Sequence, residues 1–573
     1  MKLCKRNREV SAQTAAICLI VSLSLFINCC DVQAADANSF LKADPNDVAA
    51  WQAMKFGITF SWGPSSLIGT EMSWSRAGKR GTYPGTGTIP VEVYDNLYKS
   101  WHPAQFDANQ WVDIAKAAGA KYVLFITKHH DGFCMFDSNT TDYKMTSTPF
   151  KRDVIRELAE ACHKTDLKLG FYYSQPDWHH PYYHTEEHPK YIRYLHSQIQ
   201  ELCSNYGKLD IICFDGLRNR PQTWDAVNLF KLIRSLQPHV VINNRAGLAA
   251  DYQTPEQFAG SFQTDPPWES WITISEQWAY KANDTLKTLK QCIQPLVKVV
   301  GSDGNFNLSI GPMPTGEIEP GQVERLKEIG NWLNKYGQSI YATRGGPFKP
   351  GLWGASTYKD NIIYLHILSW QDFPPLLPPI DKKIISSEVL TSGTIDIKQN
   401  KTGIAVNIPQ QYQNDIDTII KLTLDGPAKV IKPLVVSSGS LAAHKPVRTS
   451  NKAGRSGENV VDDDFSTFWT AETSAKQAWL EVDLGKNVTF DRVLIHEANS
   501  PWFQYVEKFE LQYKTDGNWK NILEGTKIGP DYCKQFDPVT ARTVRLNISQ
   551  AKDAPSIWEF QLFAPRNNKE LKK

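Results

Sequence analysis

The sequence predicts an α/β protein: a (β/α)8-like barrel followed by an antiparallel β-sandwich and a second, C-terminal β-sandwich. Three observations predict this order. Apolar, strand-like runs alternate with amphipathic segments between about residues 51 and 337. From about residue 352 the apolar runs become short and typical of antiparallel strands, and a polar stretch at 437–459 separates two such regions. At 573 residues the chain is also too long for a single core.

The barrel is predicted from the strand–helix alternation, taken in chain order. The strand-like runs are 122–127, 167–174, 209–214 and 240–243, and the helix-like segments between them are 152–164, 189–206 and 225–236. Alternation at this spacing indicates βαβ units and therefore a parallel sheet. Because it recurs so often within about 300 residues, a closed barrel is favoured over an open sheet.

We expect four segments along the chain. They are a signal peptide at 1–34, a catalytic barrel at 35–345, a β-sandwich at 346–436 and a C-terminal domain at 437–565. The glycine- and proline-rich run 346–351 ends the barrel pattern, and the sandwich strands are expected at 361–368, 383–390 and 403–408.

The N-terminus has the layout of a secretory signal. Basic residues precede an apolar stretch at 14–27, and Val32-Gln33-Ala34 could be the cleavage signal. We therefore expect a secreted or periplasmic protein. Cys29 and Cys30 raise lipoprotein anchoring as an alternative, although the residues before them fit a lipobox poorly. No later apolar run reaches the length of a membrane span.

Charge and cysteine usage argue against several classes of partner. The formal net charge is +2 and basic residues are not clustered, which argues against a nucleic-acid or anionic-membrane surface. The six cysteines outside the leader show no CxxC spacing, so metal or redox use is not expected. We expect no cofactor.

Candidate catalytic carboxyls stand on separate segments. Asp215 follows the apolar run that ends at Phe214, and Gly216 leaves room for a ligand beside it. Asp215 therefore suits a nucleophile. Its partner acid is Glu269 or Glu256. We favour Glu269, because the preceding Trp268 could desolvate its carboxyl and raise its pKa. Glu256 could equally cap a helix that begins at Pro255. Two carboxyls on separate loops are typical of glycoside hydrolysis.

Further polar groups lie at strand ends. His129 and His130 are adjacent, and on a regular strand their side chains would point to opposite sides, so both reach a ligand only if the strand has ended. Together with Asp131 they could suggest a metal, but no third ligand stands at a recognisable spacing. Hydrogen bonds to sugar hydroxyls explain the histidines without one. Arg245 could orient the nucleophile or bind a hydroxyl.

Taken together, these residues resemble the α-L-fucosidases of glycoside hydrolase family 29. The matching segments run from Lys55 to Gly337 and include 62–64, 127–133, 170–174, 214–216, 243–245, 268–269, 277–280 and 307–312. The resemblance implies a (β/α)8-like barrel with a β-sandwich, and a retaining exo-glycosidase that releases terminal α-L-fucose from a fucosylated oligosaccharide or glycoconjugate by double displacement. It implies Asp215 as nucleophile, and substrate contacts from Ser61, Trp62, Asp95, His129, His130, Tyr172, Arg245 and Trp278.

Two departures bear on specificity. The family usually has His-Trp-Gly where this chain has Ser61-Trp62-Gly63, and that His contacts a sugar hydroxyl. The Asp-Gly motif is usually preceded by Trp-Phe, and here by Cys213-Phe214. Ser61 motivates two alternatives: an α-L-galactosidase or related L-sugar hydrolase, and a catalytically weak glycan-binding protein.

The C-terminal region resembles, more weakly, the discoidin-like domains related to the coagulation-factor type C family. The segments that carry this resemblance are 460–465, 467–469, 479–484 and 492–495. It implies a β-sandwich that commonly binds carbohydrate in secreted glycosidases.

Overall fold

The computed structural model describes residues 39–565 except 82, 84, 217–219, 259–260, 452–454, 498–503 and 531. The signal peptide expected at 1–34 lies outside the described residues. Within them, none of the helices combines the length and the apolar character needed to cross a membrane.

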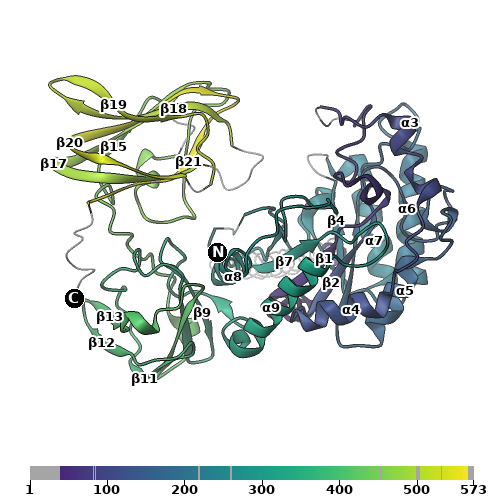
Figure 1. The fold of residues 1–573 in the computed structure, drawn as a ribbon, viewed down its shortest axis with the longest axis horizontal. Coiled ribbons are helices and arrows are strands. Elements are labelled where there is room, and N and C mark those ends of the chain that lie inside the picture. The colour runs from purple at the N-terminus through teal and green to yellow at the C-terminus, as the bar shows by residue number, and fades with distance from the viewer. Residues whose placement is uncertain are drawn as a thin grey trace, which may run out of the picture.

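The first domain is built on a curved sheet of parallel strands (Figure 1). The strands are β1 (Phe56–Phe60), β2 (Tyr122–Lys128), β3 (Lys168–Tyr173), β4 (Ile211–Phe214), β5 (Val241–Ile242), β6 (Glu269–Thr273) and β7 (Asn305–Ile310). Their order in the sheet is β5-β4-β3-β2-β1-β7-β6. This arrangement confirms the predicted parallel α/β architecture.

An irregular segment at 251–257 closes the ring between β5 and β6. Parallel bridges pair Tyr252 with Asn243 on one side, and Gln253 with Trp268 and Glu256 with Trp271 on the other. The segment therefore takes the place of an eighth strand, as a (β/α)8-like barrel requires.

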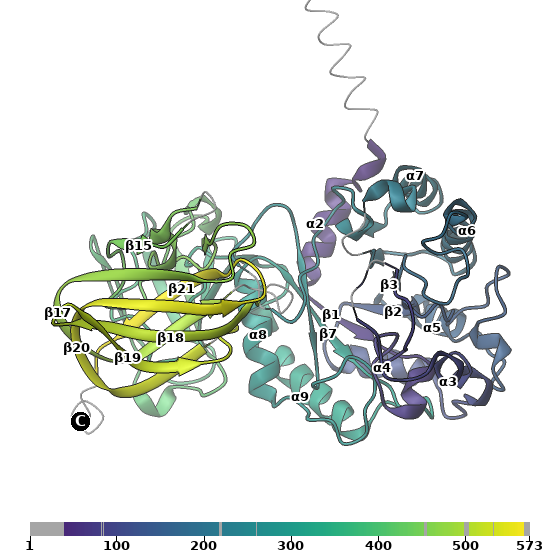
Figure 2. The same cartoon turned by 90° about the horizontal axis from the view of Figure 1, so that it is seen from above.

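Helices cover the outside of the barrel (Figures 1 and 2). They are α4 (Ala108–Ala117), α5 (Val154–His163), α6 (His188–Asn205), α7 (Ala226–Leu236), α8 (Leu289–Gly301) and α9 (Pro320–Tyr336). Two further helices are α2 (Pro45–Met54), whose Trp51 packs with the inner layer of the barrel, and the one-turn α3 (Val91–Tyr94) in the loop between β1 and α4. Capping side chains fix where several of these helices begin. Asp107 and Asp153 accept backbone N–H groups at the starts of α4 and α5, and Thr288 with Gln291 forms a capping box at α8.

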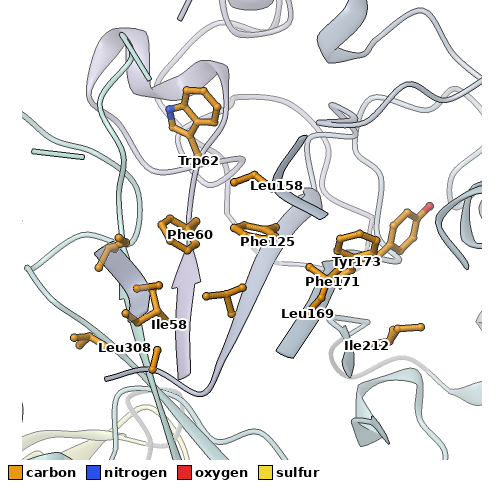
Figure 3. Packing of buried hydrophobic residues seen from close by; sticks show 14 of the residues in the cluster. Ile58, Phe60, Trp62, Phe125, Leu158, Leu169, Phe171, Tyr173, Ile212 and Leu308 are labelled. Carbon is orange, nitrogen blue, oxygen red and sulfur yellow. The ribbon is translucent and has the colours of Figure 1, made fainter. Parts of the chain in front are cut away.

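The strands divide their side chains between two layers. Successive residues of a strand point to opposite faces, so one set fills the barrel and the other packs beneath the helices. Figure 3 shows part of the outer layer, with Ile58 and Phe60 of β1 beside Phe125 of β2. The inner layer contains Leu124, Tyr172, Cys213 and Trp271, among others.

The second domain is antiparallel, as predicted. One sheet has the order β11-β14-β10-β9-β8, and a separate hairpin joins β12 to β13. The strands are β8 (Arg344–Gly345), β9 (Gly354–Lys359), β10 (Ile362–Ile367), β11 (Ile384–Val389), β12 (Asp396–Asn400), β13 (Gly403–Asn407) and β14 (Thr418–Leu424).

The C-terminal domain is a separate antiparallel β-structure with its own core (Figure 2). Its strands are β15 (Val447–Thr449), β16 (Trp469–Thr470), β17 (Ala478–Glu497), β18 (Val506–Thr515), β19 (Asn518–Gly525), β20 (Tyr532–Ala551) and β21 (Ser556–Phe563). Ion pairs join it to the second domain: Lys349 lies 2.6 Å from Asp464, and Arg492 lies 3.2 Å from Asp372.

Candidate active site

Asp215 lies inside the barrel at the carboxyl end of β4. It is two residues beyond Cys213, which faces the barrel interior, so the alternation of the strand carries its side chain to the same side. Its carboxylate accepts hydrogen bonds from Tyr172 Oη at 2.6 Å and from Arg245 Nη1 at 2.9 Å. His130 Nε2 lies 3.5 Å away. Three groups predicted from sequence are thus brought to Asp215.

These neighbours keep Asp215 ionised. Burial by itself would raise the pKa of this carboxyl, but the Arg245 guanidinium, His130 and the Tyr172 hydroxyl together hold it below its usual range. A buried carboxylate that remains charged and is aimed into the barrel mouth suits nucleophilic attack.

Glu256 is the second carboxyl of this site. Its Oε1 lies 2.5 Å from Arg245 Nη1, the same nitrogen that donates to Asp215. Because distances of 2.9 Å and 2.5 Å meet at one atom, the two carboxylate oxygens lie no more than about 5.4 Å apart. Carboxyls lie about 5–5.5 Å apart in retaining glycosidases and about 6.5–9.5 Å apart in inverting ones, so this upper limit excludes the inverting separation. Glu256 belongs to the irregular eighth strand and caps no helix.

The pKa of Glu256 moves in the opposite direction from that of Asp215. Burial raises it and the negative charge of Asp215 raises it further, while Arg245 opposes the shift. The charged form of Asp215 is therefore stabilised, whereas Glu256 takes up a proton more readily than an ordinary glutamate. Two carboxyls whose pKa values are pushed apart in this way suit a nucleophile and a general acid.

Glu269 does not join this pair, which corrects our preference for it as the general acid. It is the first residue of β6, toward the amino-terminal end of the barrel, and its side chain is fully buried. Both oxygens are engaged, one by the Tyr122 hydroxyl and the other by Trp271 Nε1 at 2.5 Å. Burial raises its pKa to about 7, as expected, but the carboxyl has no free oxygen with which to reach a substrate.

The two histidines both reach the site because β2 ends at Lys128. His129 Nδ1 lies 2.6 Å from Ser73 Oγ, and His130 Nδ1 lies 2.5 Å from Ser174 Oγ. Burial lowers the pKa of both imidazoles, so both are neutral near neutral pH and can hydrogen-bond sugar hydroxyls. Ser73 gave no sequence signal, whereas Ser174 ends the segment 170–174 that was already singled out.

The histidines also bear on metal binding. His129, His130 and Asp215 each place one potential ligand atom within 4.8 Å of the others. Asp131, the third ligand considered from sequence, is turned away: its carboxylate accepts from Tyr94 Oη at 2.7 Å. Arg245 already neutralises the carboxylate of Asp215, which disfavours a second cation there.

Ser61 and Trp62 follow β1 and point to opposite layers. Ser61 faces the barrel interior, and its Oγ lies 2.8 Å from Ser309 Oγ. Trp62 lies outside, packed against Trp101 and Trp111, and its indole donates to a backbone carbonyl (Figure 3). The buried indole of Trp62 thus belongs to the outer layer, and the expectation that it contacts substrate stays a prediction.

Asp95 and Trp278 occupy the rim of the barrel. Asp95 forms a bidentate pair with Arg76 at 2.6 and 2.7 Å, and Asp215 is not among its contacts. Trp278 is half-buried at the edge of the interior layer, and its backbone N–H donates to Glu71 Oε1 at 2.7 Å. Glu71, which sequence reasoning missed, thus holds the Trp278 loop.

Two family models match the chain. The family model described as alpha-L-fucosidase matches residues 30–338, and the F5/8 type C domain model matches residues 443–560. The chain belongs to the α-L-fucosidase family. Human plasma alpha-L-fucosidase is 28% identical over 409 residues, which cover 64% of this chain and 87% of that protein.

Solved structures of fucosidases share the fold. Alpha-L-fucosidase isoenzyme 1 from Paenibacillus thiaminolyticus has a TM-score of 0.60 at 36% identity and covers 66% of this chain and 99% of its own. An alpha-L-fucosidase of Bacteroides thetaiotaomicron, trapped as a covalent intermediate with 2-fluoro-fucosyl fluoride, has a TM-score of 0.58 at 25% identity, covering 67% and 97%. The family confirms the resemblance drawn from the sequence.

Proposed function

We propose that this chain is a retaining α-L-fucosidase in which Asp215 is the nucleophile and Glu256 the general acid and base. The observation that carries the proposal is the pair of carboxyls bridged by one nitrogen of Arg245. Their separation suits a double displacement, and their pKa shifts run in the directions that the two roles need.

The first displacement forms a fucosyl-enzyme. The Asp215 oxygen attacks the anomeric carbon of a terminal α-L-fucosyl unit, and the bond from that carbon to the glycosidic oxygen breaks. Glu256 gives its proton to the departing oxygen. Arg245 lies between the two carboxyls, and its positive charge stabilises whichever of them is ionised at each stage. Neutral His129 and His130 bind sugar hydroxyls.

The second displacement releases fucose. Glu256, now ionised, removes a proton from a water molecule, and the water oxygen attacks the anomeric carbon from the face that the leaving group vacated. The ester bond to Asp215 breaks and the carboxylate is restored. Two inversions leave the product with the α configuration. No step requires a cofactor, and the substrate is a fucosylated oligosaccharide or glycoconjugate.

The family match favours this activity over the alternatives that Ser61 raised. The Ser61 hydroxyl is already within hydrogen-bond distance of Ser309. The direct test is hydrolysis of aryl α-L-fucoside beside aryl α-L-galactoside, with the anomeric configuration of the first product followed by proton NMR. Release of α-L-fucose first, with little hydrolysis of the galactoside, is expected. Initial release of the β-anomer would contradict a retaining mechanism.

We also propose that the chain is exported, on the strength of the basic residues and apolar stretch at its N-terminus. Expression of the full chain with its leader, fractionation and N-terminal sequencing of the mature protein test this. A mature protein that begins after Ala34 in the periplasmic or extracellular fraction is expected. An uncleaved chain in the cytoplasmic fraction would contradict export, and a mature N-terminus at a lipidated Cys would establish anchoring instead.

A further inference from the structure

Glu269 is a fully buried carboxyl that the proposed mechanism leaves without a role. It receives two hydrogen bonds from side chains, the Tyr122 hydroxyl on one oxygen and Trp271 Nε1 on the other. A buried acid costs free energy unless its partners compensate for the lost water. Glu269 nevertheless lies in the barrel interior, bonded to Trp271 of the inner layer.

A glycine on β1 makes room for the contact between Tyr122 and Glu269. Tyr122 begins β2, and its ring lies across β1 at Gly57. A Cβ at Gly57 would lie 2.1 Å from a ring carbon of Tyr122, so only glycine leaves room for the ring. The phenol thereby reaches Glu269 on the far side of the barrel interior. The geometry around Glu269 is thus built from three strands.

Trp271 links this acid to the active site. Its Nε1–H points to Glu269, and its ring centroid lies 5.9 Å from that of Tyr172 at an angle of 48°. Tyr172 in turn stacks on His129 at 5.7 Å and donates its hydroxyl to Asp215 at 2.6 Å. A rotation of the unanchored indole would change the packing that holds the Tyr172 phenol.

We propose that Glu269 is a positioning residue for the nucleophile: by holding the Trp271 indole it fixes Tyr172, whose hydrogen bond keeps Asp215 in place and ionised. This inference rests on the proposed role of Asp215. It assigns Glu269 no contact with substrate, and it accounts for a buried acid that the sequence alone made a candidate for general acid.

The charge state of Glu269 makes the inference testable by pH. Burial raises its pKa to about 7, so the carboxyl is neutral at the acidic pH where Asp215 takes up its proton. Removing a neutral group exerts no direct Coulomb effect on Asp215. Cys213 and Tyr252, which also face Glu269, have raised pKa values and are neutral there as well. A shift in the titration of Asp215 is therefore not a direct charge effect and is carried by the packing around Trp271, whose ring contacts Tyr172.

Several other groups face Asp215 itself. They are Arg245, His130, His129, Glu256 and Tyr172. Of these, Tyr172 contacts the ring of Trp271, and Glu256 is paired with Trp271 through the backbone alone in the described contacts. Losing its hydrogen bond raises the pKa of Asp215, because the charged form loses a donor. The acidic limb of kcat/KM, which reports the free enzyme, then moves to higher pH.

The experiment compares Glu269→Leu, Glu269→Gln and Tyr173→Phe in the full chain with an aryl α-L-fucoside. Glu269→Leu should move the acidic limb up by about half to one pH unit and lower kcat about tenfold with a smaller change in KM. Glu269→Gln can still accept from the indole and should stay within about threefold of wild type. Tyr173→Phe is the matched control. Tyr173 follows Tyr172 on β3 but faces the outer layer, and the change removes its buried hydrogen bond to Gln198. It should leave the acidic limb of the pH profile in place.

Trp271→Phe tests the same link from the other end. It removes the indole N–H and should reproduce the upward shift of the limb, and the double variant with Glu269→Leu should add little to either single change. If Glu269→Leu does not fold, Trp271→Phe alone decides. A limb that stays at its wild-type position in the folded variants would overturn the inference. If Asp215→Ala still hydrolyses the fucoside, the proposed function itself has failed instead.

Discussion

Two acids of the barrel, the partly buried Glu256 and the fully buried Glu269, lie in different surroundings. Burial raises the pKa of both. Glu256 lies on the irregular eighth strand and shares Arg245 with Asp215, whereas Glu269 begins a regular strand and has both oxygens engaged by Tyr122 and Trp271. A raised pKa therefore does not by itself identify a general acid. The deciding property is whether the carboxyl lies beside the nucleophile.

The same contrast separates the two layers of the barrel wall. Inner residues such as Tyr172 act on the site through hydrogen bonds, and outer residues such as Trp62 act on stability through packing. Substitutions in the two layers should consequently change different measurements.

The largest effect is expected from Asp215→Ala. Removing the nucleophile should lower kcat by about 10⁴-fold or more, because the covalent route is lost. Steady-state kinetics on an aryl α-L-fucoside measure this, with circular dichroism as the check on folding. Activity close to that of wild type would contradict the assignment of Asp215 as the nucleophile.

The next effect separates the two acids directly. Glu256→Ala should slow substrates with poor leaving groups by about 10²–10⁴-fold while activated aryl fucosides suffer far less in the first displacement. Glu269→Gln should slow both kinds of substrate equally and slightly. Rates with a series of aryl leaving groups of known pKa give the slope for each variant. A steep slope for Glu269→Gln and a flat one for Glu256→Ala would return the acid role to Glu269.

A smaller effect is expected from Tyr172→Phe. A hydrogen bond to a charged group contributes about 1.5–3 kcal/mol, so kcat/KM should fall by about ten- to a hundredfold. Activity needs Asp215 ionised, and it is therefore lost as pH falls through the pKa of Asp215. That pKa is held low in the wild type, so losing the phenol should move the acidic limb upward. An unmoved limb would mean that Tyr172 does not tune the nucleophile.

The smallest kinetic effect is expected from Trp62→Phe. The indole packs among Trp101, Phe106 and Trp111 in the outer layer, so the change should lower the melting temperature by several degrees, from a loss of about 1–2 kcal/mol. KM should stay within about twofold of wild type. Calorimetry measures the melting temperature, and steady-state kinetics measure KM. A large rise in KM with an unchanged melting temperature would place Trp62 in the substrate site after all.

The sequence predicted the parts of the site that regular strands present. Asp215 follows a clear apolar run, so its place at the carboxyl end of β4 could be derived from strand parity and barrel geometry. Arg245 and the histidines were placed by the same argument. The antiparallel character of the later domains also followed from their short strands.

The sequence could not rank the two glutamates, for a physical reason. The segment 251–257 closes the barrel without an apolar run, so nothing marked Glu256 as a strand residue. Glu269 is the first residue of its strand and does not follow the strand's end, and a short apolar segment does not reveal where the strand begins. The pairing of Asp95 with Arg76 and the outward turn of Trp62 depend on tertiary packing that no local pattern carries.

The most direct test of the assignment is the configuration of the product formed with azide. In Asp215→Ala, azide occupies the place of the missing carboxylate and attacks from the same face, so β-L-fucosyl azide is expected. In Glu256→Ala, an activated substrate still forms the ester with Asp215, and azide then attacks from the opposite face, so α-L-fucosyl azide is expected. Proton NMR distinguishes the two. If Glu256→Ala gives no α-azide and a Glu269 variant does, the pair at the centre of this account is wrong.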